Sequence, residues 1–112
     1  VAEERQAQNR FSRVIDQLAG SGTSVGANVA EADQAMSVRD FRKCLAIAIK
    51  ELAETRYWLR LCVRRNWLPP TRLDPLLEEL AELKLIIGTI LTRSRPPKKA
   101  FPNSPLTNNP TI

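Results

Sequence analysis

The sequence predicts an all-α fold of antiparallel helices, and three observations lead to this prediction. Two long segments carry apolar residues at alternating spacings of four and three, as helices with one apolar side do. No segment shows the alternation with a period of two that marks a strand. The link between the two long segments holds only about six residues, so these helices must pack antiparallel.

The first third of the chain contains two helical segments. Residues 2–19 have the apolar spacing of an amphipathic helix. Residues 24–35 are rich in small side chains, and Ser24 is a suitable N-cap for a helix that begins there. Gly20 and Gly22 lie at the junction, where the sequence is compatible with a break, a kink or a continuous helix weakened by glycine.

Residues 38–65 form the longest predicted helix. Ser37 and Asp40 match a variant of the capping box that begins a helix. No glycine or proline interrupts this segment before Asn66. One apolar seam follows its whole length: Phe41, Leu45, Ala48, Leu52, Thr55, Leu59 and Cys62.

The last predicted helix follows Pro69 and Pro70, with Thr71 or Asp74 as its N-cap. Its apolar seam consists of Leu76, Leu80, Leu83, Ile87 and Ile90. Residues 1–93 are therefore expected to form one helical domain. Residues 94–112 are rich in proline and lack apolar periodicity, so we expect a disordered or extended tail.

The glycine-rich stretch GSGTSVGANVAEA, residues 20–32, looks at first like a phosphate-binding loop. A dinucleotide-binding loop follows a strand, and a P-loop has a lysine after its last glycine. Neither feature is present here. We expect instead that the small residues allow this segment to lie close against a neighbouring helix.

Composition argues against several classes of function. The chain has no histidine and two cysteines, Cys44 and Cys62, which are too far apart in one helix to form a disulfide, so we expect free thiols and no metal site. Without a histidine base or an evident cleft, we expect neither enzymatic activity nor a cofactor. No apolar run is long enough to span a membrane, so we expect a cytoplasmic protein.

Basic residues gather on one side of the 38–65 helix when it is projected at about 100° per residue. This side is either an ordinary solvated surface or a surface for nucleic-acid phosphates or an acidic partner. Aromatic residues are not interleaved with the bases, so non-specific contact with a nucleic-acid backbone is the most that the pattern supports. The residues are Arg39, Arg42, Lys43, Lys50, Arg56, Arg60 and Arg64.

A second, mixed strip of the same helix lies off the main seam. A monomer with one core would expose its large apolar side chains, so we predict a subunit interface here. The alternative is a broad core within a single bundle. The strip consists of Ile47, Glu51, Glu54, Trp58 and Leu61.

Three segments of the sequence resemble a known bacterial family. SGTSVGANVAEA (21–32), SVRDF (37–41) and LAIAIKELAETRYWL (45–59) are similar to motifs of four-helix-bundle proteins related to those encoded by intervening sequences in 23S ribosomal RNA genes. The family usually has a longer helix before the first motif, whereas about sixteen residues precede Gln17 here. Many members also have adjacent arginines where this chain has Ala19 and Gly20.

The resemblance implies an up-and-down antiparallel four-helix bundle that assembles as a ring-like homopentamer, without known catalytic activity. Similar proteins are accessory subunits of diversity-generating retroelements, where a basic pentamer partners a reverse transcriptase and nucleic acid. Our leading hypothesis is a non-enzymatic oligomeric scaffold that binds RNA or DNA through its basic side. The alternative is a protein-binding adaptor for a partner enzyme such as a reverse transcriptase.

Overall fold

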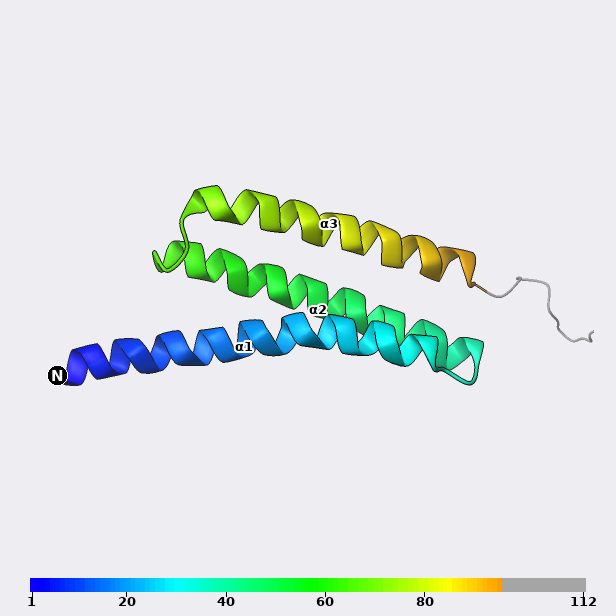
Figure 1. Ribbon diagram of the computed structural model, residues 1–112, viewed down its shortest axis with the longest axis horizontal. Helices are drawn as coiled ribbons and strands as arrows, with labels where there is room; N and C mark the ends of the chain where they lie inside the picture. Colours follow the sequence, from blue (N-terminus) through cyan, green and yellow to red (C-terminus); the bar gives the residue numbers. More distant parts are fainter. Residues whose placement is uncertain (96–112) are drawn as a thin grey trace, which may run out of the picture.

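The computed structural model describes residues 1–95 and contains three helices in that range. Helix α1 spans Ala2–Asp33, α2 spans Val38–Arg64 and α3 spans Pro70–Arg93. The chain runs up, down and up again, with α2 between the two others (Figure 1). Helices α1 and α3 each pack against α2, and their backbones do not approach each other closely. The predicted all-α fold is confirmed, whereas the predicted four-helix bundle is wrong.

The helix count differs because the first two predicted segments are one continuous helix. Gly20, Gly22 and Gly26 all lie inside α1, and no glycine in residues 1–95 has a positive φ. Ser24, the expected N-cap, is an interior residue whose carbonyl accepts a 2.9 Å hydrogen bond from Asn28 Nδ2. A glycine in a helix costs only about 1 kcal/mol, which tertiary packing readily offsets.

The glycines of α1 do not mark a close approach within the chain. A Cβ atom added at Gly20, Gly22 or Gly26 would meet no heavy atom of a neighbouring element within 4 Å in the described part of the chain. The stretch does pack against α2, as predicted, but through Ser21, Val25 and Ala32, which are buried, and not through its glycines. The three glycines lie on the exposed side of α1.

Helix α2 begins and ends as its sequence predicts. Ser37 Oγ accepts a 3.0 Å hydrogen bond from the backbone N–H of Asp40, which caps the first turn. The helix ends before Asn66, which has a positive φ of 63°. Asparagine tolerates this left-handed conformation better than most residues, so the chain can turn sharply here.

Helix α3 begins earlier than its sequence predicts. Pro69 is the N-cap and Pro70 the first helical residue, a position where proline's missing N–H costs nothing. Thr71 and Asp74, the predicted caps, both lie inside the helix. The predicted tail begins at Ser94, which is the C-cap of α3, and residues 96–112 lie outside the described residues.

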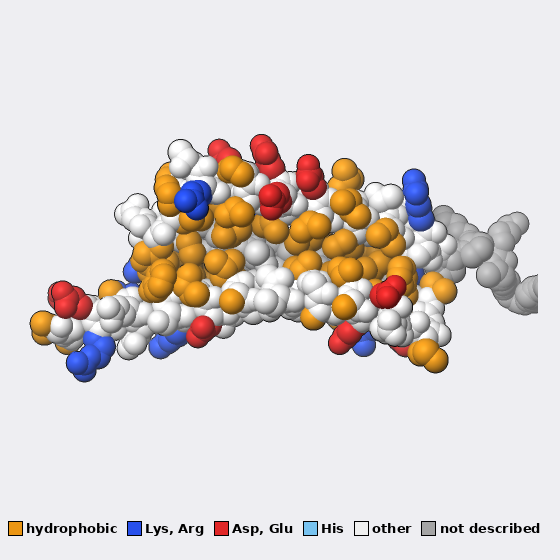
Figure 2. Space-filling model, viewed as in Figure 1, with side chains coloured by type: hydrophobic (Ala, Val, Ile, Leu, Met, Phe, Trp, Pro, Cys, Tyr) orange, Lys and Arg blue, Asp and Glu red, His pale blue; other side chains and the backbone are white. Residues whose placement is uncertain are grey.

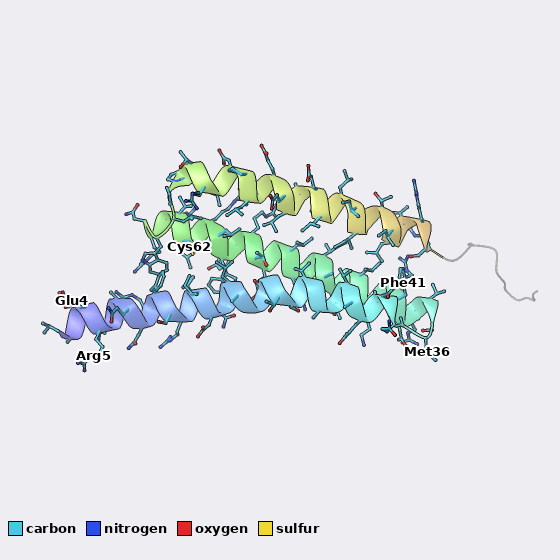
Figure 3. All side chains as sticks on the ribbon, viewed as in Figure 1. Glu4, Arg5, Met36, Phe41 and Cys62 are labelled. Atoms are coloured by element: carbon cyan, nitrogen blue, oxygen red, sulfur yellow. The ribbon has the colours of Figure 1, made fainter. Side chains whose placement is uncertain are left out.

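The core lies along one side of α2, where α1 and α3 cover it. Buried side chains from all three helices meet there, and Phe41 and Cys62 mark the two ends of α2 (Figure 3). This packing leaves the opposite side of α2 exposed. The apolar cluster consists of Val25, Ala32, Leu45, Ala48, Leu52 and Ile87.

Candidate nucleic-acid interface

Most of the predicted basic residues lie on the side of α2 that neither α1 nor α3 covers. Their exposure follows from the helical repeat, because the buried seam occupies the other side of the same helix. We define the basic face by six exposed side chains: Arg39, Lys43, Lys50, Arg56, Arg60 and Arg64.

Arg42, the seventh predicted residue, has a different role. Its side chain is half-buried, and its Nη1 atom donates hydrogen bonds to the carbonyl oxygen of Leu91 and, at 2.9 Å, to Ser94 Oγ. Both acceptors lie at the C-terminal end of α3, where the helix dipole favours a positive charge. Arg42 therefore fastens α3 to α2 and contributes less than its neighbours to a surface for ligands.

A shallow cavity of about 380 Å³ lies in the C-terminal half of the basic face. Arg56, Arg60 and Arg64 line it at successive spacings of four residues, together with exposed Tyr57. Within residues 1–95 the only ion pair joins the N-terminal amine to Glu4, so no carboxylate neutralises these arginines. Unpaired guanidinium groups in a row are well suited to contact successive phosphates.

The residues predicted to form a subunit interface are all half-buried. Trp58 donates a 3.2 Å hydrogen bond from Nε1 to Glu54 Oε2, and with Leu61 it lines a cavity shared with α1. Helix α1 thus covers part of this strip within one chain. Ile47 and Glu51 lie farther along the same strip and are also half-buried.

A larger uncovered apolar surface lies elsewhere, and the sequence did not reveal it. Figure 2 shows hydrophobic side chains gathered along one face of the molecule, over and between α1 and α3. Several large apolar side chains of α1 and α3 are more than a third exposed. We define the apolar face by Phe11, Ile15 and Val29 of α1 and by Leu76, Leu83 and Ile90 of α3.

The spacing of seven residues between apolar side chains in α3 is the sequence feature from which this surface could have been predicted. Leu76, Leu83 and Ile90 belong to the seam that the sequence assigns to the core, but only Ile87 of that seam is buried. Leu80 is half-buried against the core. The apolar seam of α3 is wider than the surface that packs against α2. The apolar side chains along one edge of the seam therefore stay exposed.

Residues 1–95 contain neither a metal-binding cluster nor a membrane-spanning helix. No group of three or more histidine, cysteine, aspartate or glutamate side chains is close enough to hold a metal ion there. None of the three helices has an apolar stretch long enough to cross a membrane. Cys44 and Cys62 are both free thiols, as predicted.

Comparisons with known proteins identify the family. Residues 2–89 match the family described as 23S rRNA-intervening sequence protein. The structure resembles the crystal structure of a protein of unknown function from the S23 ribosomal protein family of Bacteroides thetaiotaomicron, with a TM-score of 0.68 and 37% identity over 70% of this chain and 72% of the other. No curated protein matches the chain. The chain therefore belongs to the 23S rRNA-intervening sequence protein family.

Proposed function

We propose that this protein is a non-enzymatic, self-associating scaffold that binds nucleic acid through its basic face. The observation that carries the proposal is the row of exposed bases along α2, none of which is paired with a carboxylate in residues 1–95. Phosphate contacts need only such a row, because the nucleic-acid backbone supplies regularly spaced negative charges. Binding of this kind depends on salt and little on sequence.

Self-association is supported by the apolar face. Exposed apolar patches of this kind on small proteins usually mark an interface. The apolar face consists of residues of α1 and α3 and the basic face of residues of α2, so a second copy can cover the former and leave the latter free. A contact in which an edge of one copy enters the apolar face of the next is heterologous, and such contacts can close into rings. The homopentamer implied by the family resemblance remains our prediction for the number of subunits.

RNA is the first nucleic acid to test, because the family name refers to an intervening sequence of 23S rRNA. The measurement is the affinity of the full chain for a fluorescently labelled RNA duplex as a function of salt. Non-specific phosphate binding weakens linearly on a log–log plot, by a slope of about 0.9 per contacted phosphate for DNA duplexes and a similar order for RNA. A salt-independent affinity would contradict the proposal.

A charge-reversal variant tests which surface binds. Lys50→Glu combined with Arg60→Glu and Arg64→Glu should weaken duplex binding by at least about tenfold, since three phosphate contacts become repulsive. The matched control reverses Arg5, Arg72 and Arg93, which are exposed bases outside the basic face. It has the same net charge and should bind much more tightly than the first variant. Equal losses in both variants would show that net charge, and no particular face, determines binding.

A protein-binding adaptor would behave differently in these titrations. A protein-binding scaffold would bind neither RNA nor DNA duplexes at low salt, and its complexes with a partner enzyme would survive nuclease treatment. Failure of both wild-type titrations would therefore overturn the nucleic-acid proposal.

A further inference from the structure

A second cavity lies between the N-terminal half of α1 and the C-terminal end of α2. Its volume is about 550 Å³, and it opens to solvent next to the basic face, since Leu61 lines both cavities. We call it the Arg–Trp pocket. Its polar and aromatic lining consists of Arg10, Arg13 and Gln17 from α1 with Trp58, Arg65 and Trp67 from α2 and the link that follows.

The two indole rings of this pocket are held by neighbouring side chains. The Trp67 ring meets the Phe11 ring edge to face, with centroids 5.1 Å apart, and the Arg65 guanidinium carbon lies 5.5 Å from its centroid. The Trp58 ring makes an edge contact with Tyr57 at 4.9 Å, and its N–H is bound by Glu54. Both rings are therefore fixed before any ligand arrives, which lowers the entropic cost of binding.

The charges of the pocket favour an anion. Arg10, Arg13 and Arg65 are exposed, and none of them forms an ion pair within residues 1–95. No carboxylate lines the pocket, and Glu54 accepts the hydrogen bond of the Trp58 indole N–H. Guanidinium groups bind phosphate oxygens in a two-pronged geometry, and flat aromatic rings bind the faces of nucleobases.

We propose that the Arg–Trp pocket binds one unpaired nucleotide of a single-stranded nucleic acid, with its base against an indole and its phosphates at the arginines. The inference rests on the proposed function and specifies the form of the nucleic acid. A base inside a duplex is stacked on its neighbours and cannot enter such a pocket, whereas an unpaired base can. The strand then continues over Leu61 onto the basic face.

A nucleotide fits this site better than a phosphorylated or acidic peptide. Glu54, the hydrogen-bond acceptor of Trp58 Nε1, would also accept a hydrogen bond from a ring N–H group of a base, such as N3–H of uracil, but repel a peptide carboxylate. Two indoles in one cavity also give a planar base more contact than a flexible peptide side chain would gain. The peptide is therefore an alternative for the experiment to exclude.

The chain offers a direct readout, because its only two tryptophans, Trp58 and Trp67, both line the pocket. The full chain is titrated with a uridylate oligonucleotide of about eight residues, within the usual range of site sizes. Intrinsic tryptophan fluorescence should be quenched by the single strand. Inorganic phosphate and a phosphoserine peptide serve as comparison ligands and should leave the fluorescence nearly unchanged.

Variants separate the pocket from the basic face. Arg10→Gln with Arg13→Gln should weaken single-strand binding by about tenfold and lower the salt slope by about 1.4, as the loss of two phosphate contacts requires. Its affinity for a duplex should change little. The matched control, Lys43→Gln with Lys50→Gln, removes the same charge from the basic face and should weaken both forms alike. Trp58→Leu, checked by circular dichroism for intact helices, should reduce both the quenching and the single-strand affinity.

The outcomes distinguish failure of the pocket from failure of the proposed function. If a labelled single strand binds but neither quenches tryptophan nor responds to the Arg10 and Arg13 changes, the pocket proposal is wrong and nucleic-acid binding stands. If neither single strand nor duplex binds, the proposed function fails as well. Quenching by the phosphoserine peptide and not by uridylate would overturn the pocket proposal in favour of a peptide site.

Discussion

The hydroxyl group of Thr55 in α2 donates a 2.9 Å hydrogen bond to the hydroxyl group of Ser21 in α1, and both side chains are buried. Ser21 in turn donates a 3.2 Å hydrogen bond to the carbonyl oxygen of Leu18. The pair links the two helices within the glycine-rich part of α1. Thr55 Oγ1 also lies 2.8 Å from the carbonyl oxygen of Glu51 in its own helix. A buried polar pair of this kind favours one alignment of the two helices, because a shift would break the hydrogen bond that joins them.

Replacing Thr55 by valine should lower the free energy of unfolding by about 1–3 kcal/mol, since Ser21 Oγ loses its buried donor. Urea denaturation followed by circular dichroism measures this change. The double variant Ser21→Ala with Thr55→Val removes both hydroxyl groups and should be more stable than the two single losses predict when added. Strict additivity would mean that the hydrogen bond contributes nothing to stability.

Arg42 should contribute to stability more than to ligand binding. Replacing it by methionine removes the charged donor at the end of α3 and should cost about 1.5–3 kcal/mol. Hydrogen exchange should show faster opening of the last turns of α3. Lys43→Met, at the exposed neighbouring position, is the control and should change stability by less than about 0.5 kcal/mol. If the two variants are equally stable, Arg42 does not fasten α3.

Local patterns in the sequence determine much of this fold. The capping box at Ser37 and the seam of α2 place that helix almost to the residue, and the short link before Pro70 makes α3 antiparallel to it. The continuity of α1 was not predictable, because its outcome depends on whether packing at Ser21, Val25 and Ala32 offsets the glycine penalty. Propensity alone does not decide between those alternatives.

The candidate site was predictable to a similar extent. The helical projection of α2 correctly predicts that six of the basic residues are exposed, because they lie opposite its buried seam. The role of Arg42 depends on where α3 ends, and the Arg–Trp pocket joins residues more than forty positions apart in sequence. Such contacts between distant residues depend on tertiary packing, which cannot be predicted from helical periodicity.

Substituting Gly20 by alanine should stabilise the protein. The added methyl group meets nothing within 4 Å in residues 1–95, and alanine is favoured over glycine in a helix by about 1 kcal/mol. Urea denaturation should show a gain of about 0.5–1 kcal/mol. Ala19→Gly at the adjacent exposed position should cause a loss of similar size. A destabilised Gly20→Ala variant would show that another surface packs closely against this position.

The two thiols should differ in reactivity, because burial raises the pKa of Cys62 above its ordinary value of 9.0. The thiolate is the reactive form, so alkylation of the native protein should occur first at half-buried Cys44. The folded state holds the Cys62 proton more tightly than the unfolded state does. Stability is therefore retained below the ordinary thiol pKa and is lost as the pH rises through the raised value.

Urea denaturation at neutral and alkaline pH tests this linkage. The wild type should lose more stability on alkalinisation than Cys62→Ala, whereas Cys44→Ala should follow the wild type. An identical pH response in wild type and Cys62→Ala would contradict the assignment to Cys62.

The central claim is that the apolar face is covered by another copy of the chain while the basic face remains free. Sedimentation equilibrium of the wild type and of Leu83→Glu, with circular dichroism as a check on folding, tests it most directly. We predict an oligomeric wild type that still binds RNA, and a helical Leu83→Glu variant of lower mass, because a charge cannot be buried at that contact without a partner. A wild type that sediments as a monomer at micromolar concentration would contradict the account.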